Sequence, residues 1–548
     1  MVNPIVTVNI SLTQPPAPSN LQRTGALISQ GGTTLGVGAF QLLTQPSDLT
    51  PYLAAPLALS GTVWASTYGG QVTATAGANH GIAIGQKFTT TIAGVLPAGY
   101  NGTYTAIATG AATFTYYLTS DPGAYVSGGT YLPRNAGELQ TMVNSFFGQG
   151  LQQSVYVLET GAGEPAVGVA NLQAFINAQP AQKFYAYLVP RNWDANTDFL
   201  ALAALFQNTN AQTYFFTTTT LQNFGVYTSA MKDIVPLIEA PPVGVWASNV
   251  VTNAVFSTGV VTVTTTTNHG VAPGQYFTLT GILPAGYNGT YMALPGTTTT
   301  SLLYAKASTP GAYVSGGLLV ASAYASTGIP ATEFTLATYF QYVLAQNPTG
   351  AIKVPPFAFT YLFGVTPFPQ LGNSSILATL ALSEISYITQ GNFAGLSQNI
   401  LFKGHSRDGN PFNFWYEIDW LAINLVLNLS NAVVTGNNNK LNPLYYNQDG
   451  INRLEQVAYN TGATGISYGL YLGVPVQYQL PQEEFLSKLN SGDFIGQMPF
   501  NAIPFTTYAT INPNDYPIGK YGGLSVVATP QNGFEQIIFN LNVTQFVG

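Results

Sequence analysis

The sequence contains no cysteine and little charge for its length. Of its 548 residues, 14 are Lys or Arg and 21 are Asp or Glu, so charged residues make up 6% of the chain, where soluble domains usually carry about 25%. Without cysteine the chain has no disulfide, no thiolate zinc site and no cysteine nucleophile. Its few, scattered cations cannot form the basic surface of a nucleic-acid-binding protein, so we expect no nucleic-acid partner.

Long apolar runs and targeting signals are also missing. A membrane-spanning helix needs about 20 consecutive apolar residues. The best candidate, 418–434, is interrupted by Asp419 and three asparagines, so no membrane insertion is expected. The first ten residues, MVNPIVTVNI, have neither the charged region nor the smooth apolar region of a secretory signal. No signal peptide is therefore predicted.

What the chain does contain favours a folded protein with several domains. Apolar residues make up 46% and aromatic residues 13% of the chain, which excludes a disordered protein. A single core rarely grows beyond about 300 residues, so this length predicts two to four domains. A chain rich in Gly, Thr and Tyr but poor in charge relies on backbone pairing and aromatic packing. Such a composition is more typical of extracellular assemblies and virion components than of cytoplasmic enzymes.

Two segments, 59–133 and 243–320, are copies of one module. Identical stretches occur at matching places, among them Leu96–Tyr104 with Leu283–Tyr291 and Pro122–Gly129 with Pro310–Gly317. The segments between them are rich in Thr, Val, Tyr and Phe, which favour β-strands. Asn-Gly at 101–102 and 288–289 predicts a tight turn in each copy. We predict two small β-sandwiches or barrels, module 1 and module 2, inserted into another domain.

The rest of the first half, 21–58 together with 134–242, predicts an α/β block. Strand and helix patterns alternate there, which favours βαβ units and a mostly parallel sheet within a mixed sheet. Strands are expected at Ser154–Leu158, Phe184–Val189, Tyr214–Thr218 and Ile234–Ile238, and helices at Ala136–Phe147, after Glu164-Pro165, at Asp198–Gln207 and at Leu221–Met231.

From 321 to 533 the pattern predicts a separate C-terminal α/β unit. Helices are expected at Glu333–Ala345, Asn373–Thr389 and Tyr416–Thr435, and from Asp449-Gly450 to Gly462. The helix over 416–435 carries apolar residues on all its faces and is expected to stop at Gly436. We therefore expect it to be buried nearly all round.

Both chain ends alternate apolar and polar residues, as half-buried strands do. We define the N-terminal arm as residues 1–20 and the C-terminal arm as residues 534–548. Their apolar faces consist of Val6, Val8, Ile10 and Leu12, and of Phe539, Leu541 and Val543. Two interpretations stay open: the strands belong to the chain's own sheet, or they are inter-subunit arms that add to the sheet edge of a neighbouring subunit.

Candidate metal and cofactor groups are few. His80 and His269 occupy equivalent Asn-His-Gly turns, and His405 has no second His or Cys near it in the sequence, so no metal site is predicted. Gly161-Ala162-Gly163 begins like a dinucleotide-binding fingerprint. However, Pro165 and the lack of a suitably spaced acidic residue favour a simple turn before a helix. No cofactor is predicted.

Acidic pairs also have structural explanations. Glu417 and Asp419 are expected to begin a helix, where residues two apart point away from each other and the helix dipole favours acidic side chains. Glu483-Glu484 is expected to be an exposed helix start. The glycosylation sequons, such as those at Asn101 and Asn428, are chance matches in a Thr-rich chain. No catalytic residue is predicted, and we expect that the protein is not an enzyme.

With these residues in view, the chain resembles the contractile tail sheath proteins of myophages, the tailed bacteriophages with contractile tails. The resemblance rests on the N-terminal strand arm, the α/β block with β insertions, the segments Glu417–Asn424 and Gln448–Ile451 of the C-terminal unit, and the final β arm. It covers most of 1–58, 134–242 and 321–548. The two modules are similar to decoration modules of phage structural proteins.

The resemblance implies a viral structural protein that forms stacked hexameric rings in a helical assembly around the tail tube. Contraction would drive the tube through the host envelope and lead to genome ejection. The implied partners are neighbouring sheath subunits joined by β-strand addition, the tail tube protein, and the baseplate and tail terminator proteins. The implied location is the virion, after assembly in the host cytoplasm, and no cofactor is implied.

In such proteins the C-terminal unit faces the tube and variable insertions project outward. Cations would be needed on the tube-facing surface, and the candidates are Lys403, Arg407, Lys440 and Arg453. Two other classes stay open. A virion receptor-binding, glycan-binding, decoration or fibre protein would explain the Tyr-rich modules, and a secreted polysaccharide-active enzyme would explain the aromatic residues but requires convergent acids.

Overall fold

The computed structural model describes residues 20–534, apart from gaps at 66–69, 83, 85, 134, 180, 209–210, 222, 241–248, 267–268, 270, 272–275, 295, 322–328, 369–373 and 394–395. The chain divides into two compact units. The larger unit contains Leu21–Gln346 and Pro356–Asn413, and the smaller unit contains Asn347–Pro355 and Phe414–Asn532.

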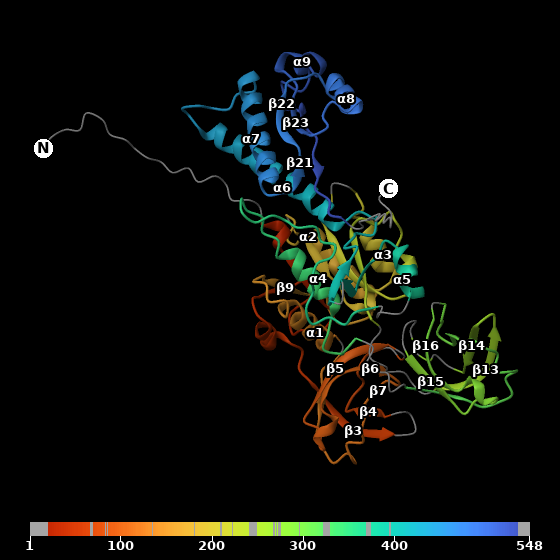
Figure 1. Ribbon diagram of the computed structural model, residues 1–548. Coiled ribbons are helices and arrows are strands. Elements are labelled where there is room, and N and C mark those ends of the chain that lie inside the picture. The colour runs from red at the N-terminus through yellow and green to blue at the C-terminus, as the bar shows by residue number, and fades with distance from the viewer. Residues whose placement is uncertain are drawn as a thin grey trace, which may run out of the picture. The chain divides into compact units, whose positions relative to one another are not determined.

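An eight-stranded mixed sheet forms the core of the larger unit (Figure 1). In sheet order its strands are β2 (Phe40–Leu43), β9 (Val155–Glu159), β1 (Gly25–Ser29), β10 (Ala186–Leu188), β11 (Tyr214–Thr219), β12 (Ile234–Ile238), β19 (Ser386–Phe393) and β20 (Leu396–Phe402). The strands from β9 to β19 pair in parallel, and the outer strands β2 and β20 pair antiparallel. The predicted mixed α/β class with a largely parallel sheet is confirmed.

Helices cover both faces of this sheet, because its central strands are apolar on both sides and every residue of β1, β11 and β12 is buried. One face packs against α2 and α3 through a core that includes Leu172, Phe199 and Phe215. On the other face, Phe216 contacts Phe340 of α4, which packs against α1. The four helices are α1 (Ala136–Phe147), α2 (Pro165–Ala178), α3 (Thr197–Ala204) and α4 (Thr335–Leu344).

The helix predicted over Leu221–Met231 is wrong. Among its described residues, the segment contains only a short 3-10 helix at Phe224–Val226. Two of its side chains are tied to one carboxylate instead: the Tyr227 hydroxyl and the Asn223 amide donate to the two oxygens of Asp194, at 2.8 and 2.9 Å. These tertiary hydrogen bonds hold the segment as a loop over the end of the sheet.

The second half of the helix predicted over Asn373–Thr389 is also wrong. The helix α5 spans Ser374–Ala381, and the chain then enters β19. The last residues of β12 pair in parallel with Ser386 and Tyr387. Strand pairing with a distant segment thus overrides the local helical pattern. As a consequence β19 and β20 extend the large sheet, although the sequence assigned them to the C-terminal unit.

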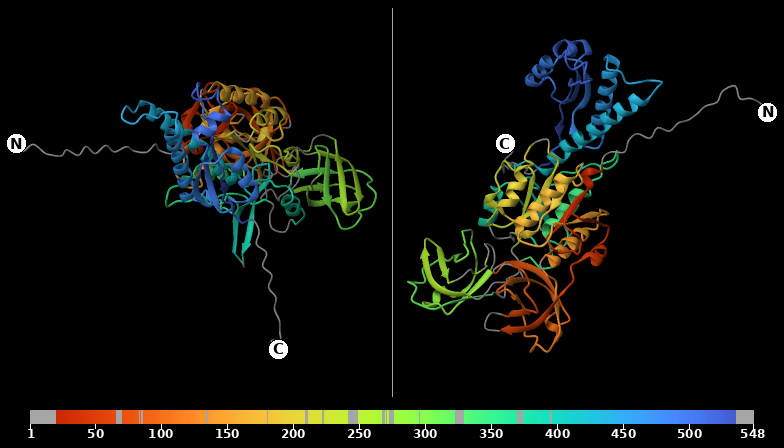
Figure 2. Two further views of the ribbon diagram at one scale, coloured as in Figure 1. Left: turned by 90° about the horizontal axis from the view of Figure 1, so that it is seen from above. Right: turned by 180° about the vertical axis from the view of Figure 1, so that it is seen from behind.

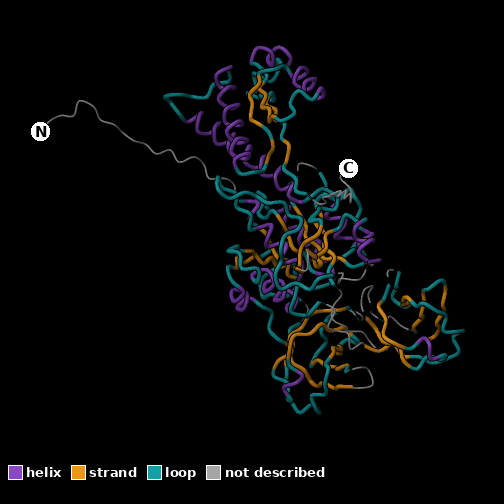
Figure 3. The backbone as a smooth tube through the Cα atoms, in the orientation of Figure 1, coloured by secondary structure: helices purple, strands orange, loops and turns teal. Residues whose placement is uncertain are grey.

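The two repeats form separate antiparallel β structures (Figures 2 and 3). Module 1 is a closed barrel of β3 (Leu57–Ala65), β4 (Gln71–Ala76), β7 (Thr113–Tyr117), β6 (Gly102–Ala108), β5 (Lys87–Ala93) and β8 (Thr130–Tyr131). Module 2 is a six-stranded sheet of β16 (Gly289–Met292), β15 (Tyr276–Thr280), β18 (Leu318–Ala321), β13 (Asn249–Ser257), β14 (Val260–Thr265) and β17 (Ser301–Ala305). Each has its own apolar core, with an equivalent pair of stacked tyrosines, Tyr104 with Tyr116 and Tyr291 with Tyr304.

The Asn-Gly pairs of the modules do not form the predicted tight turns. Asn101 has an extended backbone after a short 3-10 turn, and Gly102 already begins β6. The Asn101 side chain bridges the preceding loop, because it accepts from the Val95 N–H and donates to the Val95 carbonyl at 2.9 and 3.1 Å. Asn288 makes the same two bonds with Ile282. Asparagine is required here for its side chain rather than for a left-handed backbone.

Module 2 should be removable without unfolding the larger unit. Its first and last strands are hydrogen-bonded neighbours, with Asn249 opposite Leu319, so the two ends lie about 5 Å apart. We expect replacement of 250–318 by a short Gly/Ser linker to leave a soluble protein whose melting temperature changes by less than about 4 °C, measured by calorimetry. Insoluble or non-cooperatively melting protein would contradict this expectation. Removal of module 1 is the stricter test, because its strand β5 packs against α1 of the α/β block.

The smaller unit combines helices with two small sheets. Its helices are α6 (Phe412–Asn438, beginning in the larger unit), α7 (Gln448–Ser467), α8 (Gln482–Ser491) and α9 (Phe505–Ile511). The strands β22 (Val474–Tyr478), β23 (Gln497–Ala502) and β24 (Leu524–Val526) form one sheet, and β21 (Tyr471–Leu472) pairs with β25 (Thr529–Pro530). Glu483 and Glu484 are exposed in the first turn of α8, as predicted.

The helix ends predicted at two glycines are wrong. α6 continues past Gly436, and α7 continues past Gly462. A Cβ at Gly436 would lie 2.6 Å from the Cβ of Leu444, and a Cβ at Gly462 would lie 2.2 Å from the ring of Phe500. Each glycine therefore lies inside its helix instead of ending it. The missing side chain lets Leu444 pack closely on α6 and Phe500 pack closely on α7.

α6 is not buried nearly all round, which corrects the sequence expectation. Its Asn428 amide donates to the Thr461 hydroxyl of α7 at 2.9 Å, but Val426 is 69% and Val434 is 60% exposed. Within the described part of the chain, α6 is the one helix long and apolar enough to cross a membrane by length and composition, and 28% of its most apolar stretch is buried. The second half of the helix thus leaves an apolar face, with Val426, Val433 and Val434, uncovered within the chain.

Candidate functional site

The candidate site lies where the parallel strands of the larger unit end. The strand order reverses at β1, because β9 lies on one side of it and β10 to β12 lie on the other. In sheets of this kind, such a reversal opens a crevice at the carboxyl ends of the strands. Gln30, Arg191 and Glu239 follow β1, β10 and β12 respectively, and all three line a cavity there.

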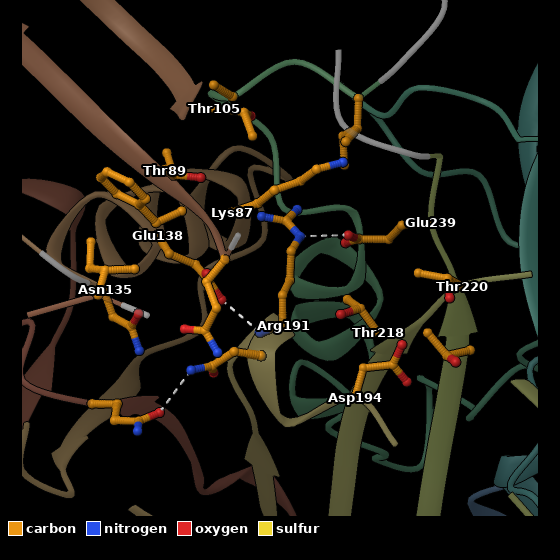
Figure 4. A pocket seen from close by; sticks show the side chains of 18 of the residues that line it. Lys87, Thr89, Thr105, Asn135, Glu138, Arg191, Asp194, Thr218, Thr220 and Glu239 are labelled. Atoms are coloured by element: carbon orange, nitrogen blue, oxygen red, sulfur yellow. Dashed lines mark hydrogen bonds and ion pairs between the residues drawn. The ribbon is translucent and has the colours of Figure 1, made fainter. Parts of the chain in front are cut away.

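The cavity has a volume of about 360 Å³, which lies within the range of small-molecule pockets. The α/β block forms one wall. Module 1 forms the other wall with Gln86, Lys87, Phe88, Thr89 and Thr105 (Figure 4). Module 1 reaches this place because it is inserted directly before α1, whose first turn packs against β5.

Arg191 is the centre of a network of ionisable groups in the cavity. Its Nε donates to Glu239 at 2.8 Å, its guanidinium also donates to the Glu333 carbonyl at 2.9 Å, and its backbone N–H donates to Glu138 at 2.7 Å. Burial acts to lower the pKa of Arg191, but the surrounding acids outweigh it and the pKa lies above its ordinary value. Burial raises the pKa of Glu138 and Glu239, and Arg191 opposes that rise. Arg191 and Glu239 form the ion pair of this network, at 2.8 Å.

Two further ionisable side chains line the cavity. Asp194 accepts the hydrogen bonds from Asn223 and Tyr227 described above, and burial raises its pKa while these bonds oppose the rise. Lys87 enters from module 1, and burial lowers its pKa to about 8. The lining thus carries both signs of charge, supplied by different segments of the chain.

Two threonine hydroxyls face the cavity without a hydrogen-bond partner among the described residues. Thr89 is 5% exposed and Thr218 is 4% exposed, and both line the cavity (Figure 4). The Asn135 side chain also lines it and does not cap α1, although Asn135 is the residue before the helix. These groups can both donate and accept hydrogen bonds.

A buried carboxylate holds the loops after β1 and β9 together beside this site. Glu159, at the end of β9, accepts from the hydroxyls of Ser29 and Thr33 and from the backbone N–H groups of Gly31, Thr33 and Gly161, at 2.6–3.2 Å. Gly161 has φ 86°, as a turn residue before α2 requires, and Pro165 is the first residue of that helix. The predicted simple turn before a helix is confirmed.

Glu159→Gln should lower the free energy of unfolding by about 1–3 kcal/mol, because an amide group would then face donors that now bind a carboxylate. Urea denaturation at neutral pH measures this loss. The matched control is Glu164→Gln, whose exposed side chain makes no cap hydrogen bond, and it should change stability by less than about 0.5 kcal/mol. Equal effects of the two substitutions would contradict this role of Glu159.

The three histidines lie in separate, buried places. In module 1, Nδ1 of His80 accepts from the Ile82 N–H at 3.1 Å, and in module 2 Nδ1 of His269 accepts from the Val271 N–H at 3.0 Å. Burial lowers the pKa of His269 to about 4. His405 lies 3.2 Å from Glu384. Among the described residues no group of three or more His, Cys, Asp or Glu side chains could hold a metal ion.

Glu417 and Asp419 do not begin a helix, which corrects the sequence expectation. α6 starts earlier, with the buried Phe412, so Glu417 lies in its second turn and Asp419 at the start of its third, and both are buried. The helix dipole is therefore not the reason for their position. A carboxylate oxygen of Glu417 accepts instead from the Gln531 N–H at 2.8 Å, which holds the chain after β25 against the helix.

The predicted inter-subunit arm residues lie outside the described residues. The four candidate cations lie within them. Lys403 pairs with Glu384 at 2.9 Å, and Arg407 donates to the Tyr227 carbonyl at 2.7 Å, both in the larger unit. In the smaller unit, Arg453 donates to the Pro443 carbonyl at 3.1 Å, and Lys440 is exposed.

The cavity was not predicted from the sequence, because its lining comes from segments far apart in the chain. One signal was available. Polar residues follow directly after several of the apolar strands, and the carboxyl ends of parallel strands meet at one edge of a sheet. Comparison with known proteins adds no family: no protein-family model and no curated protein matches the chain.

Proposed function

We propose that this chain is the structural subunit of a contractile bacteriophage tail sheath, which polymerises as stacked hexameric rings around the tail tube. The observation that carries the proposal is an open sheet edge in the smaller unit. Within the described part of the chain, β22 pairs with β23 on one side only. Because Val474 donates toward β23, the main-chain groups of Pro475 and Gln477 face the open side.

An arm strand from a neighbouring subunit can add to this edge through main-chain hydrogen bonds. Pro475 has no N–H to offer, which is typical of edge strands and leaves Gln477 as the central donor. Strand addition suits a chain with few charges, since it needs none. It would also link subunits firmly while other contacts change during contraction.

The uncovered apolar face of α6 supports the same function. Large exposed apolar surfaces mark contact sites, and α6 exposes Val426 and Val434, with Leu441 exposed soon after its end. The candidate tube-facing cations can also be narrowed. Lys403 and Arg407 lie in the larger unit, so Lys440 and Arg453 of the smaller unit are the proposed cations on the tube-facing surface.

Negative-stain microscopy of the purified protein tests the proposal. Tubes or stacked rings are expected, and discrete monomers or trimers at every concentration would contradict it. Gln477→Pro should prevent assembly, because it removes the central donor of the open edge. The matched control is Gln477→Val, which keeps the main-chain N–H and should assemble normally.

A further inference from the structure

The cavity at the carboxyl edge of the large sheet has no role in the assembly proposed above. We propose that it binds a small, neutral, polyhydroxylated molecule, a sugar or polyol of roughly mono- to disaccharide size. The site would be formed by the α/β block and module 1 together.

The lining is built for a polar occupant. A cavity between two packed bodies is normally closed by apolar side chains, and an empty one is normally apolar. Here the inward hydroxyls of Thr89 and Thr218, each at least nine-tenths buried, have no partner among the described residues. Buried polar groups are rarely left unpaired, so these two hydroxyls indicate a ligand that pairs with them.

The charges of the lining favour a neutral ligand. The guanidinium of Arg191 is already compensated by Glu239, and Glu138 holds its backbone. An anion would approach these two acids and Asp194, whereas a cation would approach Arg191 and Lys87. A neutral molecule with hydroxyl groups avoids both repulsions and can still accept from the cations and donate to the carboxylates.

The lining also presents apolar surface beside these polar groups. Phe368 lines the cavity and is otherwise buried. Sugars present C–H faces that pack on aromatic rings and a rim of hydroxyls that both donate and accept hydrogen bonds. The side chains of Thr89, Thr218 and Asn135 can form hydrogen bonds with the hydroxyl groups of such a sugar. The cavity is therefore suited to a polyol rather than to a purely apolar compound.

Titration of the soluble full-length chain tests this proposal. The probes are glucose, N-acetylglucosamine, maltose and glycerol, compared with inorganic phosphate and spermidine. Trp193 provides a signal, since its indole N–H donates to Gln30, which lines the cavity. We expect saturable binding of at least one neutral probe by calorimetry and fluorescence, with no competition from phosphate or spermidine.

Variants then locate the binding. Thr218→Val and Thr89→Val should each weaken binding roughly two- to tenfold, the effect of one hydrogen bond, and two separate variants guard against a folding defect in either. The control is Thr115→Val, which removes a buried, unpartnered hydroxyl of β7 outside the cavity and should leave the affinity unchanged. Binding that neither variant weakens, binding of phosphate or spermidine alone, or no binding by any probe would overturn the proposal. Because the protein is titrated unassembled, the result is independent of whether it forms tubes.

Discussion

Deletion of either arm, residues 1–14 or 534–548, should abolish tube formation and leave a folded monomer. If the arms add to a neighbour's sheet, each contributes several main-chain hydrogen bonds of about 0.5–1.5 kcal/mol. Each also buries three or four apolar side chains, at roughly 1.5–3 kcal/mol for each that is fully buried. Ordering the arm offsets part of this gain. The net binding free energy of one arm is repeated at every subunit of a ring, and it decides whether the polymer forms.

A point substitution gives a sharper version of this experiment. Val8→Pro removes one main-chain donor from the middle of the N-terminal arm and should also prevent assembly. Val8→Ile keeps the donor and the apolar face, so it should assemble. Microscopy and calorimetry on the same samples separate the two interpretations of the arms. A lowered melting temperature of the truncated monomer would show that the strands belong to the chain's own sheet, and tubes formed without an arm would also contradict the arm hypothesis.

Replacing Asp233 by Asn should stabilise the protein above pH 7 by about 4 kcal/mol. Asp233 directly precedes β12 and is 0% exposed, and neither of its carboxylate oxygens has a hydrogen-bond partner among the described residues. Burial raises its pKa from 3.8 to about 7, and the neighbouring Lys232 opposes this rise. An ionised carboxylate at this place therefore costs stability that a neutral amide of nearly the same shape does not.

The sign of the pH dependence follows from the raised pKa. The folded protein binds this proton more tightly than the unfolded chain, so its stabilising effect is complete below pH 3.8 and is lost as the pH rises to about 7. Urea denaturation of both proteins across this range should show the wild type losing stability relative to Asp233→Asn, with a constant difference above pH 7. The control is Asp198→Asn, an exposed acid in the first turn of α3. A difference that does not vary with pH would contradict the assignment.

The local sequence pattern was sufficient to predict the strands in which every residue is buried. β12 lies at Ile234–Ile238 as predicted, and β11 differs from its prediction by one residue. Short runs rich in apolar, aromatic and β-branched residues favour buried strands of this length. The two modules were evident for a different reason. Their repeated stretches carry the tyrosines and glycines that each core requires, so the duplication is visible without any tertiary information.

Tertiary structure decided whatever depends on segments far apart in the chain. Ser386 begins a strand because β12 presents an edge to it, and Gly462 lies within a helix because Phe500 packs against it. The exposure of Val426 follows from how little of α6 its neighbours cover, which periodicity cannot report. The cavity around Arg191 exists only because the ends of four strands, β1, β10, β11 and β12, meet an inserted barrel. Local pattern fixes which residues are apolar, but only packing decides which of them are covered and which polar groups converge.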